Sequence, residues 1–360
     1  MKMPNNSLTH SVLTFAAIAS CRLLLEGIIA GNNAGMAQQQ RLQFNQTSSS
    51  SVLKQEQLLE GISFQIDNVT FSHHMASVNG IQMHYVMGGQ GDPIVLLHGW
   101  PETWYEWHKV MPALAKNYTV IIPDLPGLGD SSSSSKPSST RYDGKSVAED
   151  IHQLVSQQLG FKSIFIVGHD IGAQMAYSYS AAHPTQVRKL VIIDFTGFLP
   201  GGRTLWWAAF HQAPDGIPEA LVQGKEMMYL SWFYHNLAYN PSAITQTDIN
   251  EYVSHYSAPG SMHAGFEYYR AFPLNAIQNE NYSKTTKLTM PVLAISSSYI
   301  PALGGNIIIT TNNIPMKQIM ALAQNVQVIQ VPNSGHYVPE EQPGFVIDQL
   351  FKFFGNSINE

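Results

Sequence analysis

The chain has few of the features that would point to a disulfide, a metal site or a bound nucleic acid. It has 360 residues but one cysteine, which cannot form an internal disulfide bond. Its fourteen histidines are not accompanied by an HExxH or a CxxC sequence, so we expect no metal and no cofactor. A formal net charge of -6, no Walker loop and no complete GxGxxG sequence argue against nucleic-acid and nucleotide partners.

The first sixty residues are predicted to be a signal-like segment and a disordered tether. The apolar run 11–20 is too short to cross a bilayer as a mature helix, and it resembles a signal peptide. Cleavage is expected at Cys21, as in a lipoprotein, or after Ala37. The prediction is therefore export, as a secreted protein or one anchored by a lipid on Cys21. A cytoplasmic protein with a helical leader and an inert thiol stays open. The Gln-, Ser- and Asn-rich stretch 38–57 is typical of a tether.

Strand-like and helix-like segments alternate along the rest of the chain. The expected strands are two arms around the hairpin sequence 78–81, followed by 93–97, 118–122, 163–167, 187–193, 291–295 and 326–331. The expected helices include 104–114, 146–158, 314–322 and 345–354. This alternation predicts an α/β fold with a mainly parallel eight-stranded sheet flanked by helices. Residues 195–285 interrupt it with aromatic, helix-like sequence, which predicts a helical lid between core segments 61–194 and 286–360.

The five residues from Gly168 to Gly172, GHDIG, lie between an apolar strand and a helix. Glycines on both sides of a sharp strand-to-helix turn are typical of a nucleophile elbow, here with Asp170 at its apex. A carboxylate that attacked a carbonyl would form a high-energy anhydride, whereas attack at a saturated carbon gives an alkyl ester that water can cleave. Asp170 therefore favours epoxides or carbon–halogen bonds as substrates over esters or peptides.

An ester on Asp170 needs a base to activate water, and His336 is the candidate. It lies in a loop between the last strand and the last helix, which follows the chain order of nucleophile, acid and histidine in this kind of fold. No Asp or Glu occurs from residue 281 to 339, so Asp194, after the strand next to the elbow, is expected to orient the histidine. A helix cap is the alternative for Asp194. Glu340 and Glu341 follow His336 too closely to turn back on it and are expected to begin the final helix.

The sequence His98-Gly99-Trp100-Pro101 lies where an oxyanion loop is expected. The backbone N–H groups of Trp100 and Ile171 are predicted to stabilise the oxyanion that forms when water attacks the ester. His98 is expected to contact the substrate.

Together these segments resemble the epoxide hydrolase and dehalogenase branch of the α/β-hydrolases, over about residues 72–354. The resemblance is carried by HGWPETWYEWH, PDLPGLGDS, GHDIGA, GFEYYRA and SGHYVPEE. The lid is most similar to that of secreted Cif-type epoxide hydrolases, in which a tyrosine and a lid histidine hydrogen-bond the epoxide oxygen. The resemblance assigns the tyrosine to Tyr269. Trp207 stands in the place of the histidine, and His211 follows one turn later, so both are candidate substrate contacts.

The resemblance implies hydrolysis of an epoxide to a vicinal diol, with a small apolar epoxide or halogenated compound and water as partners. A haloalkane or haloacid dehalogenase is the alternative. Fluoroacetate dehalogenases bind the substrate carboxylate with arginines after the nucleophile, where this chain has Ile171 and Gln174. Haloalkane dehalogenases typically have a tryptophan in the place of Ile171. A non-catalytic binding protein on the same fold and a homodimer both stay open.

Overall fold

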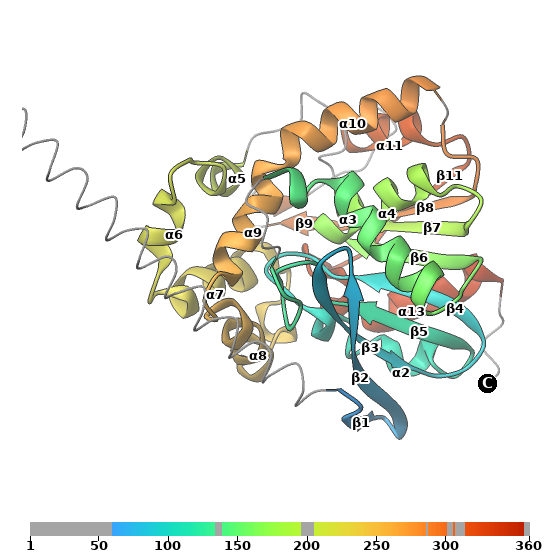
Figure 1. Cartoon of the computed structure of the whole chain (residues 1–360), viewed down its shortest axis with the longest axis horizontal. Coiled ribbons are helices and arrows are strands. Elements are labelled where there is room, and N and C mark those ends of the chain that lie inside the picture. Colours follow the sequence, from blue (N-terminus) through green and yellow to red (C-terminus); the bar gives the residue numbers. More distant parts are fainter. Residues whose placement is uncertain are drawn as a thin grey trace, which may run out of the picture. The chain divides into compact units, whose positions relative to one another are not determined.

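A mixed β-sheet runs through the middle of the fold in the computed structural model of this protein (Figure 1). The structure describes residues 60–133, 139–195, 205–285, 287–300, 305–306 and 314–355. The predicted signal segment, Cys21 and the predicted tether lie outside the described residues. None of the described helices is both long enough and apolar enough to span a bilayer.

In the described part of the chain the sheet has nine strands, in the order β1-β2-β3-β5-β4-β6-β7-β8-β11. They are β1 (Ser63–Ile66), β2 (Val69–Val78), β3 (Ile81–Gly88), β4 (Asp92–Leu97), β5 (Tyr118–Pro123), β6 (Ile164–His169), β7 (Val187–Ile193), β8 (Val292–Ser296) and β11 (Val326–Gln330). The pairs from β1 to β5 are antiparallel, and every pair from β5 to β11 is parallel. Two short strands, β9 (Tyr299–Ile300) and β10 (Gly305–Asn306), form a separate ribbon. The predicted mainly parallel α/β sheet is confirmed.

The predicted number of eight strands is wrong by one, because the expected strands did not include β1. This short strand pairs with β2 through a tight turn at Asp67 and Asn68, whose φ angles are 50° and 61°. Positive φ at both central residues matches a type I′ hairpin turn, for which Asn and Asp are favoured. The Asp-Asn pair between two alternating arms was the signal that could have revealed the strand.

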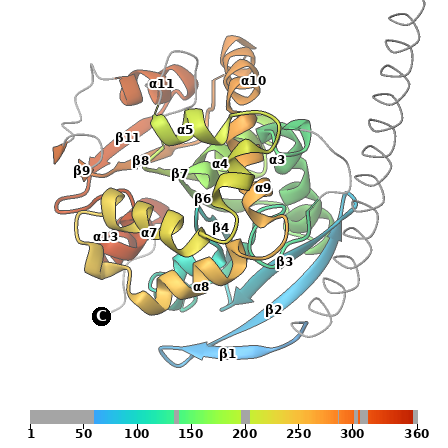
Figure 2. The ribbon, with the colours of Figure 1, turned by 90° about the vertical axis from the view of Figure 1, so that its left-hand side faces the viewer.

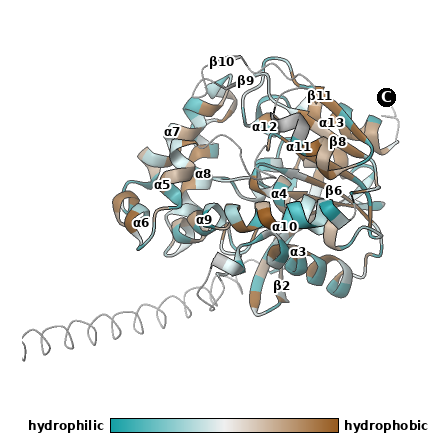
Figure 3. Cartoon of the chain, turned by 90° about the horizontal axis from the view of Figure 1, so that it is seen from above, coloured by the Kyte–Doolittle hydropathy of each residue, from teal (hydrophilic) through white to brown (hydrophobic). Residues whose placement is uncertain are grey.

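The central strands bury both faces, which is why they read as continuous apolar runs. Every residue of β6 is buried, and its side chains alternate between the two sides of the sheet. Ile166 belongs to one hydrophobic cluster, whereas Phe165 and Val167 belong to the other. Figure 3 shows the apolar colour of β8 and of α13, which covers one of these faces.

Helices cover both faces of the sheet. The core helices are η1 (Trp104–Trp107), α2 (Met111–Leu114), η2 (Ser139–Arg141), α3 (Gly144–His152), its π-helical continuation η3 (Gln153–Gln158), α4 (Ile171–Ala182), α11 (Ile314–Leu322), α12 (Val338–Glu341) and α13 (Pro343–Phe354). The single helix predicted at 104–114 is two short ones. Asp143 begins α3 by accepting hydrogen bonds from the backbone N–H groups of Lys145 and Ser146.

The predicted helical insertion lies between β7 and β8. Its helices are α5 (Trp206–His211), α6 (Ile217–Val222), α7 (Glu226–Leu237), η4 (Pro241–Ala243), α8 (Gln246–Tyr256), α9 (Ser261–Arg270) and α10 (Phe272–Thr285). Figures 1 and 2 show α5 to α9 gathered at one end of the sheet. Tyr256 and Tyr268 fix this lid to the core by donating hydrogen bonds to the carbonyl groups of Glu102 and Pro126. Residues 195–285 as the extent of the lid remain a proposal.

Candidate active site

Asp170 stands at the apex of a sharp turn between β6 and α4. Its φ of 46° and ψ of -124° are unusual for a residue with a side chain, and they mark local backbone strain. The two flanking glycines permit the turn. A Cβ on Gly168 would come within 2.2 Å of the carbonyl oxygen of Gly172, and one on Gly172 within 2.3 Å of that of Leu97. The close packing of these backbones therefore requires glycine and fixes the position of the Asp170 side chain.

His336 lies between Asp170 and Asp194. Its Nδ1 is 2.7 Å from an oxygen of Asp194, and its Nε2 is 3.4 Å from an oxygen of Asp170. The other oxygen of Asp194 accepts hydrogen bonds from the Ser297 backbone N–H (2.9 Å) and hydroxyl (2.6 Å). Asp194 is thus engaged with a histidine and a serine, which argues against the helix-cap alternative. Three residues that are far apart in the chain come together as the sequence predicted.

The two carboxylates favour the protonated form of His336. Burial lowers the pKa of this imidazole, but the hydrogen bonds with Asp170 and Asp194 outweigh it and raise the pKa to about 9. Burial raises the pKa of Asp194, and the contacts with His336 and Ser297 reverse this effect, leaving its pKa below the usual value. Hydrogen bonds with Asp170 and Asp194 therefore favour the imidazolium form of His336.

A buried cluster of ionisable side chains contains His169, which precedes Asp170 in the chain, and the sequence did not predict it. His169 Nδ1 lies 3.1 Å from Glu106 and 3.4 Å from Glu102, and its Nε2 is 2.8 Å from the carbonyl oxygen of His336. Burial and then Glu106 raise the pKa of Glu102 to about 8. Burial lowers the pKa of His169, but the two glutamates raise it well above its usual value. Two acidic residues four apart in an otherwise aromatic segment were the available signal.

Two clusters among the described residues have the geometry to hold a metal ion. One is this cluster of His169, Glu102 and Glu106, and the other consists of His84, Asp124 and Asp130. In the second cluster two of the three candidate ligands already bind each other, since His84 Nδ1 lies 2.7 Å from an oxygen of Asp124 that also accepts from the backbone N–H of Asp130. The expected absence of a metal stays a prediction.

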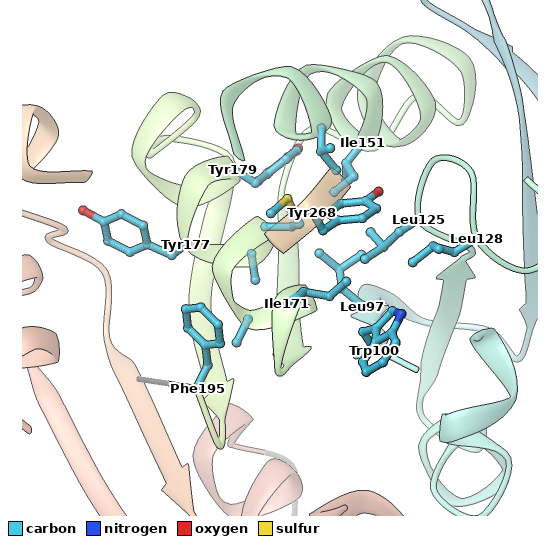
Figure 4. Packing of buried hydrophobic residues seen from close by; sticks show 14 of the residues in the cluster. Leu97, Trp100, Leu125, Leu128, Ile151, Ile171, Tyr177, Tyr179, Phe195 and Tyr268 are labelled. Carbon is cyan, nitrogen blue, oxygen red and sulfur yellow. The ribbon is translucent and has the colours of Figure 1, made fainter. Parts of the chain in front are cut away.

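The loop after β4 packs directly against Asp170. A Cβ on Gly99 would lie 2.9 Å from the Cβ of Asp170. Within the described part of the chain, the backbone N–H groups of Trp100 and Ile171 have no acceptor, so both are free to bind an oxyanion. Figure 4 shows the side chains of Trp100 and Ile171 in the cluster beside this loop.

The prediction that His98 contacts the substrate is wrong. The residue is fully buried, and both ring nitrogens bind backbone groups. Its Nδ1 is 2.8 Å from the carbonyl oxygen of Gly99, and its Nε2 accepts a hydrogen bond of 3.0 Å from the N–H of Leu125. Burial lowers the pKa of His98, which keeps it neutral. It holds the oxyanion loop in place, and the sequence could not show that both nitrogens were occupied.

Tyr269 and His211 face each other in the lid. Their rings meet edge to face with centroids 4.3 Å apart, and Trp100 lies 5.4 Å from the Tyr269 ring. Burial, followed by the charge of Asp170, raises the pKa of Tyr269 well above its usual value. His211 Nε2 is 2.6 Å from the hydroxyl of Tyr229. Its Nδ1 is buried and has no hydrogen-bond partner among the described residues.

Trp207 does not share this position. Its ring packs with Trp206, Trp232 and Phe233, at centroid distances of 5.8, 6.1 and 5.9 Å. None of its ring contacts in the described part of the chain is with Tyr269. Its predicted contact with substrate is therefore not supported. Trp207 and His211 both belong to α5. They lie one helical turn apart, so His211 packs against Tyr269 and Trp207 packs against α7.

Comparisons with known proteins agree with this geometry. The family model described as alpha/beta hydrolase fold matches residues 92–343. The soluble epoxide hydrolase of Corynebacterium sp. (strain C12) is 40% identical over 295 residues, which are 79% of this chain and 97% of the relative. The solved structure of the epoxide hydrolase CorEH without ligand has a TM-score of 0.70 and 36% identity, over 79% of this chain and 98% of that one. A fluoroacetate dehalogenase of Burkholderia sp. is 27% identical over 241 residues, 63% of this chain and 78% of the relative. This chain belongs to the α/β-hydrolase superfamily, in its epoxide hydrolase branch.

Proposed function

We propose that this chain hydrolyses small apolar epoxides to vicinal diols through an ester on Asp170. The observation that carries the proposal is an aspartate at the elbow, beside a histidine that a second aspartate orients. The similarity to a soluble epoxide hydrolase over most of both chains supports the same reaction.

In the first step, a carboxylate oxygen of Asp170 attacks one carbon of the epoxide and the bond from that carbon to the ring oxygen breaks. Tyr269 donates a hydrogen bond to this oxygen and transfers its proton as the negative charge develops. If the Tyr229 hydroxyl donates to Nε2 of His211, Nδ1 carries the proton and donates the second hydrogen bond. Because alkylation removes the charge on Asp170 that raises the pKa of Tyr269, the phenol becomes more acidic as the ring opens.

In the second step, His336 Nε2 takes a proton from water, and the hydroxide attacks the carbonyl carbon of the ester. The N–H groups of Trp100 and Ile171 stabilise the oxyanion, each by about 3 kcal/mol. The tetrahedral intermediate then collapses, and His336 returns the proton to the departing alkoxide, which completes the diol. The carboxylic acid left at Asp170 gives up its proton, and the Tyr269 phenolate formed in the first step takes up one proton, so both residues return to their starting forms.

The same change of charge prepares His336 for the second step. In the free enzyme Asp170 helps to raise the pKa of His336 to about 9, which favours the protonated form at neutral pH. An alkylated Asp170 is neutral, so this raising effect is lost while burial continues to lower the pKa. The histidine therefore becomes a base when an ester is present for it to hydrolyse.

A dehalogenase is the second candidate, supported by the similarity to a fluoroacetate dehalogenase. Displacement of a halide by Asp170 needs the same nucleophile and base. The carboxylate of a haloacid would have to be desolvated without an adjacent arginine, because Ile171 and Gln174 follow the nucleophile. Gln174 is buried, and its amide lies within hydrogen-bonding distance of Ser178. This arrangement favours epoxides.

The test is a substrate panel with diol and halide release measured on matched compounds. Styrene oxide and 1,2-epoxyhexane are compared with 1-bromohexane and fluoroacetate. The proposal predicts diol formation faster than release of bromide or fluoride. Faster halide release would establish the dehalogenase alternative, and no turnover of any compound would favour the non-catalytic binding protein.

A further inference from the structure

The loop that carries His336 is bonded directly to the lid. The His336 backbone N–H donates a 2.8 Å hydrogen bond to the carbonyl oxygen of Leu237, the last residue of α7. Gly335 packs still closer, since a Cβ on it would lie 2.3 Å from both the Leu237 carbonyl oxygen and the Tyr239 nitrogen. The backbone of the lid thus packs directly against the backbone of the His336 loop.

The Glu341 carboxylate joins the lid backbone to the His336 loop. One carboxylate oxygen accepts a 2.9 Å hydrogen bond from the N–H of Gly335, the residue before His336. The other oxygen accepts from the N–H groups of Tyr239 (2.8 Å) and Asn240 (2.9 Å) in the lid. None of these hydrogen bonds is with the His336 imidazole, which Asp194 orients instead. The expectation that Glu340 and Glu341 begin the final helix is wrong, because they end the short helix α12 and α13 begins at Pro343. The turn of α12, in which the Glu341 N–H donates a 2.8 Å hydrogen bond to the Tyr337 carbonyl oxygen, brings the carboxylate to the residue just before His336.

We propose that Glu341 is a positioning residue that couples the lid to the His336 loop and acts selectively on hydrolysis of the Asp170 ester. This inference rests on the proposed two-step function. In that mechanism alkylation requires Asp170 and the lid donors, whereas hydrolysis also requires His336 to reach a water molecule. A displaced loop therefore slows the second step and spares the first.

The chemistry of the side chain makes the role testable. Both oxygens of Glu341 face N–H donors, so both must accept. In Glu341→Gln one of these oxygens is replaced by an NH₂ group, which cannot accept a hydrogen bond. The variant keeps either the bond to Gly335 or the two bonds to the lid, but it cannot keep all three. Its volume stays nearly unchanged, which limits other damage.

The experiment follows both steps in one turnover with styrene oxide, by rapid quenching and mass spectrometry of the peptide that contains Asp170. In Glu341→Gln we expect hydrolysis of the ester to slow by about ten- to a hundredfold, as for a catalytic group displaced by up to 1 Å. Alkylation should change by less than about twofold, so the ester accumulates. Glu341→Asp keeps the charge but has a shorter reach, and it should show the same selective loss.

The matched control is Tyr105→Phe, which removes a different contact between core and lid. The Tyr105 hydroxyl lies 3.4 Å from Asp248 and touches neither Gly335 nor His336. Both steps should keep their rates in this variant, and thermal unfolding should show that all variants fold.

The outcomes separate the two proposals. If His336→Gln gives no ester, the proposed function fails. If His336→Gln gives the ester but folded Glu341→Gln hydrolyses it at the wild-type rate, the positioning role fails. Equal slowing of both steps in Glu341→Gln would also overturn that role, because it would indicate general damage to the site.

Discussion

Replacing Asp194 with Asn tests how His336 is oriented. In the structure one oxygen of Asp194 accepts two hydrogen bonds from Ser297, so an asparagine should keep its carbonyl oxygen there. Its NH₂ group would then lie at the oxygen position that is 2.7 Å from His336 Nδ1. An NH₂ group donates, so Nδ1 must become the acceptor and Nε2 must carry the proton. In this tautomer His336 cannot take a proton from water.

The expected loss follows from this tautomer and from the missing charge. The equivalent change in a serine protease lowers turnover about 10⁴-fold, or about 5 kcal/mol of activation free energy. We expect a loss of this order in hydrolysis of the ester, with little change in alkylation. Single-turnover kinetics resolve the two steps, and circular dichroism with thermal unfolding checks the fold.

Ser297→Ala is the matched control for Asp194→Asn. It removes the 2.6 Å hydroxyl contact but leaves the Asp194 carboxylate facing His336. A hydrogen bond to a charged group contributes about 1.5 kcal/mol, so hydrolysis should slow only about tenfold. The reasoning is refuted if folded Asp194→Asn hydrolyses the ester at the wild-type rate, since another carboxylate would then orient the histidine.

Three further predictions concern the lid, the pH dependence and the N-terminus. Tyr269→Phe should slow alkylation by an epoxide about a hundredfold without affecting hydrolysis of a preformed ester, whereas Trp207→Phe should leave the alkylation rate unchanged; rapid quenching measures both. The ester removes the charge on Asp170, so the pKa of His336 should be lower in the ester form than the value of about 9 in the free enzyme. Hydrolysis of the ester should lose rate as pH falls through this lower pKa, because His336 becomes protonated. The prediction is contradicted if the midpoint of the pH–rate profile is not below the pKa of His336 measured by NMR in the free enzyme. Mature protein from its native host should begin at Cys21 or soon after Ala37, and intact N-terminal peptides from soluble cytoplasm would exclude both.

The loops of the candidate active site could be predicted because their signals are local in the sequence. GHDIG specifies a turn that only closely packed glycines permit, and the structure has that turn at Asp170. The absence of acidic residues from 281 to 339 left Asp194 as the partner of His336, and the two are hydrogen bonded. The helical lid was likewise visible as an interruption of the strand and helix alternation.

The roles of individual polar side chains were harder to predict, because they depend on tertiary packing. His98 is bound by backbone groups of two different segments, one of which lies 27 residues further along the chain. Residues 207 and 211 differ by one helical turn, and only the packing of α5 shows which one meets Tyr269. Glu341 lies in the helical turn of α12, and the sequence could not show that this turn brings its carboxylate to Gly335 and to the lid backbone.

Mass spectrometry of His336→Gln after incubation with styrene oxide or 1,2-epoxyhexane tests the central claim most directly. Without the base the ester on Asp170 should form but not hydrolyse, so the peptide that contains Asp170 should gain the mass of one epoxide molecule. Wild-type enzyme and Asp170→Asn serve as controls in which no adduct accumulates at this residue. An unmodified peptide in a folded His336→Gln variant, under conditions in which the wild-type enzyme forms diol, would contradict the covalent mechanism.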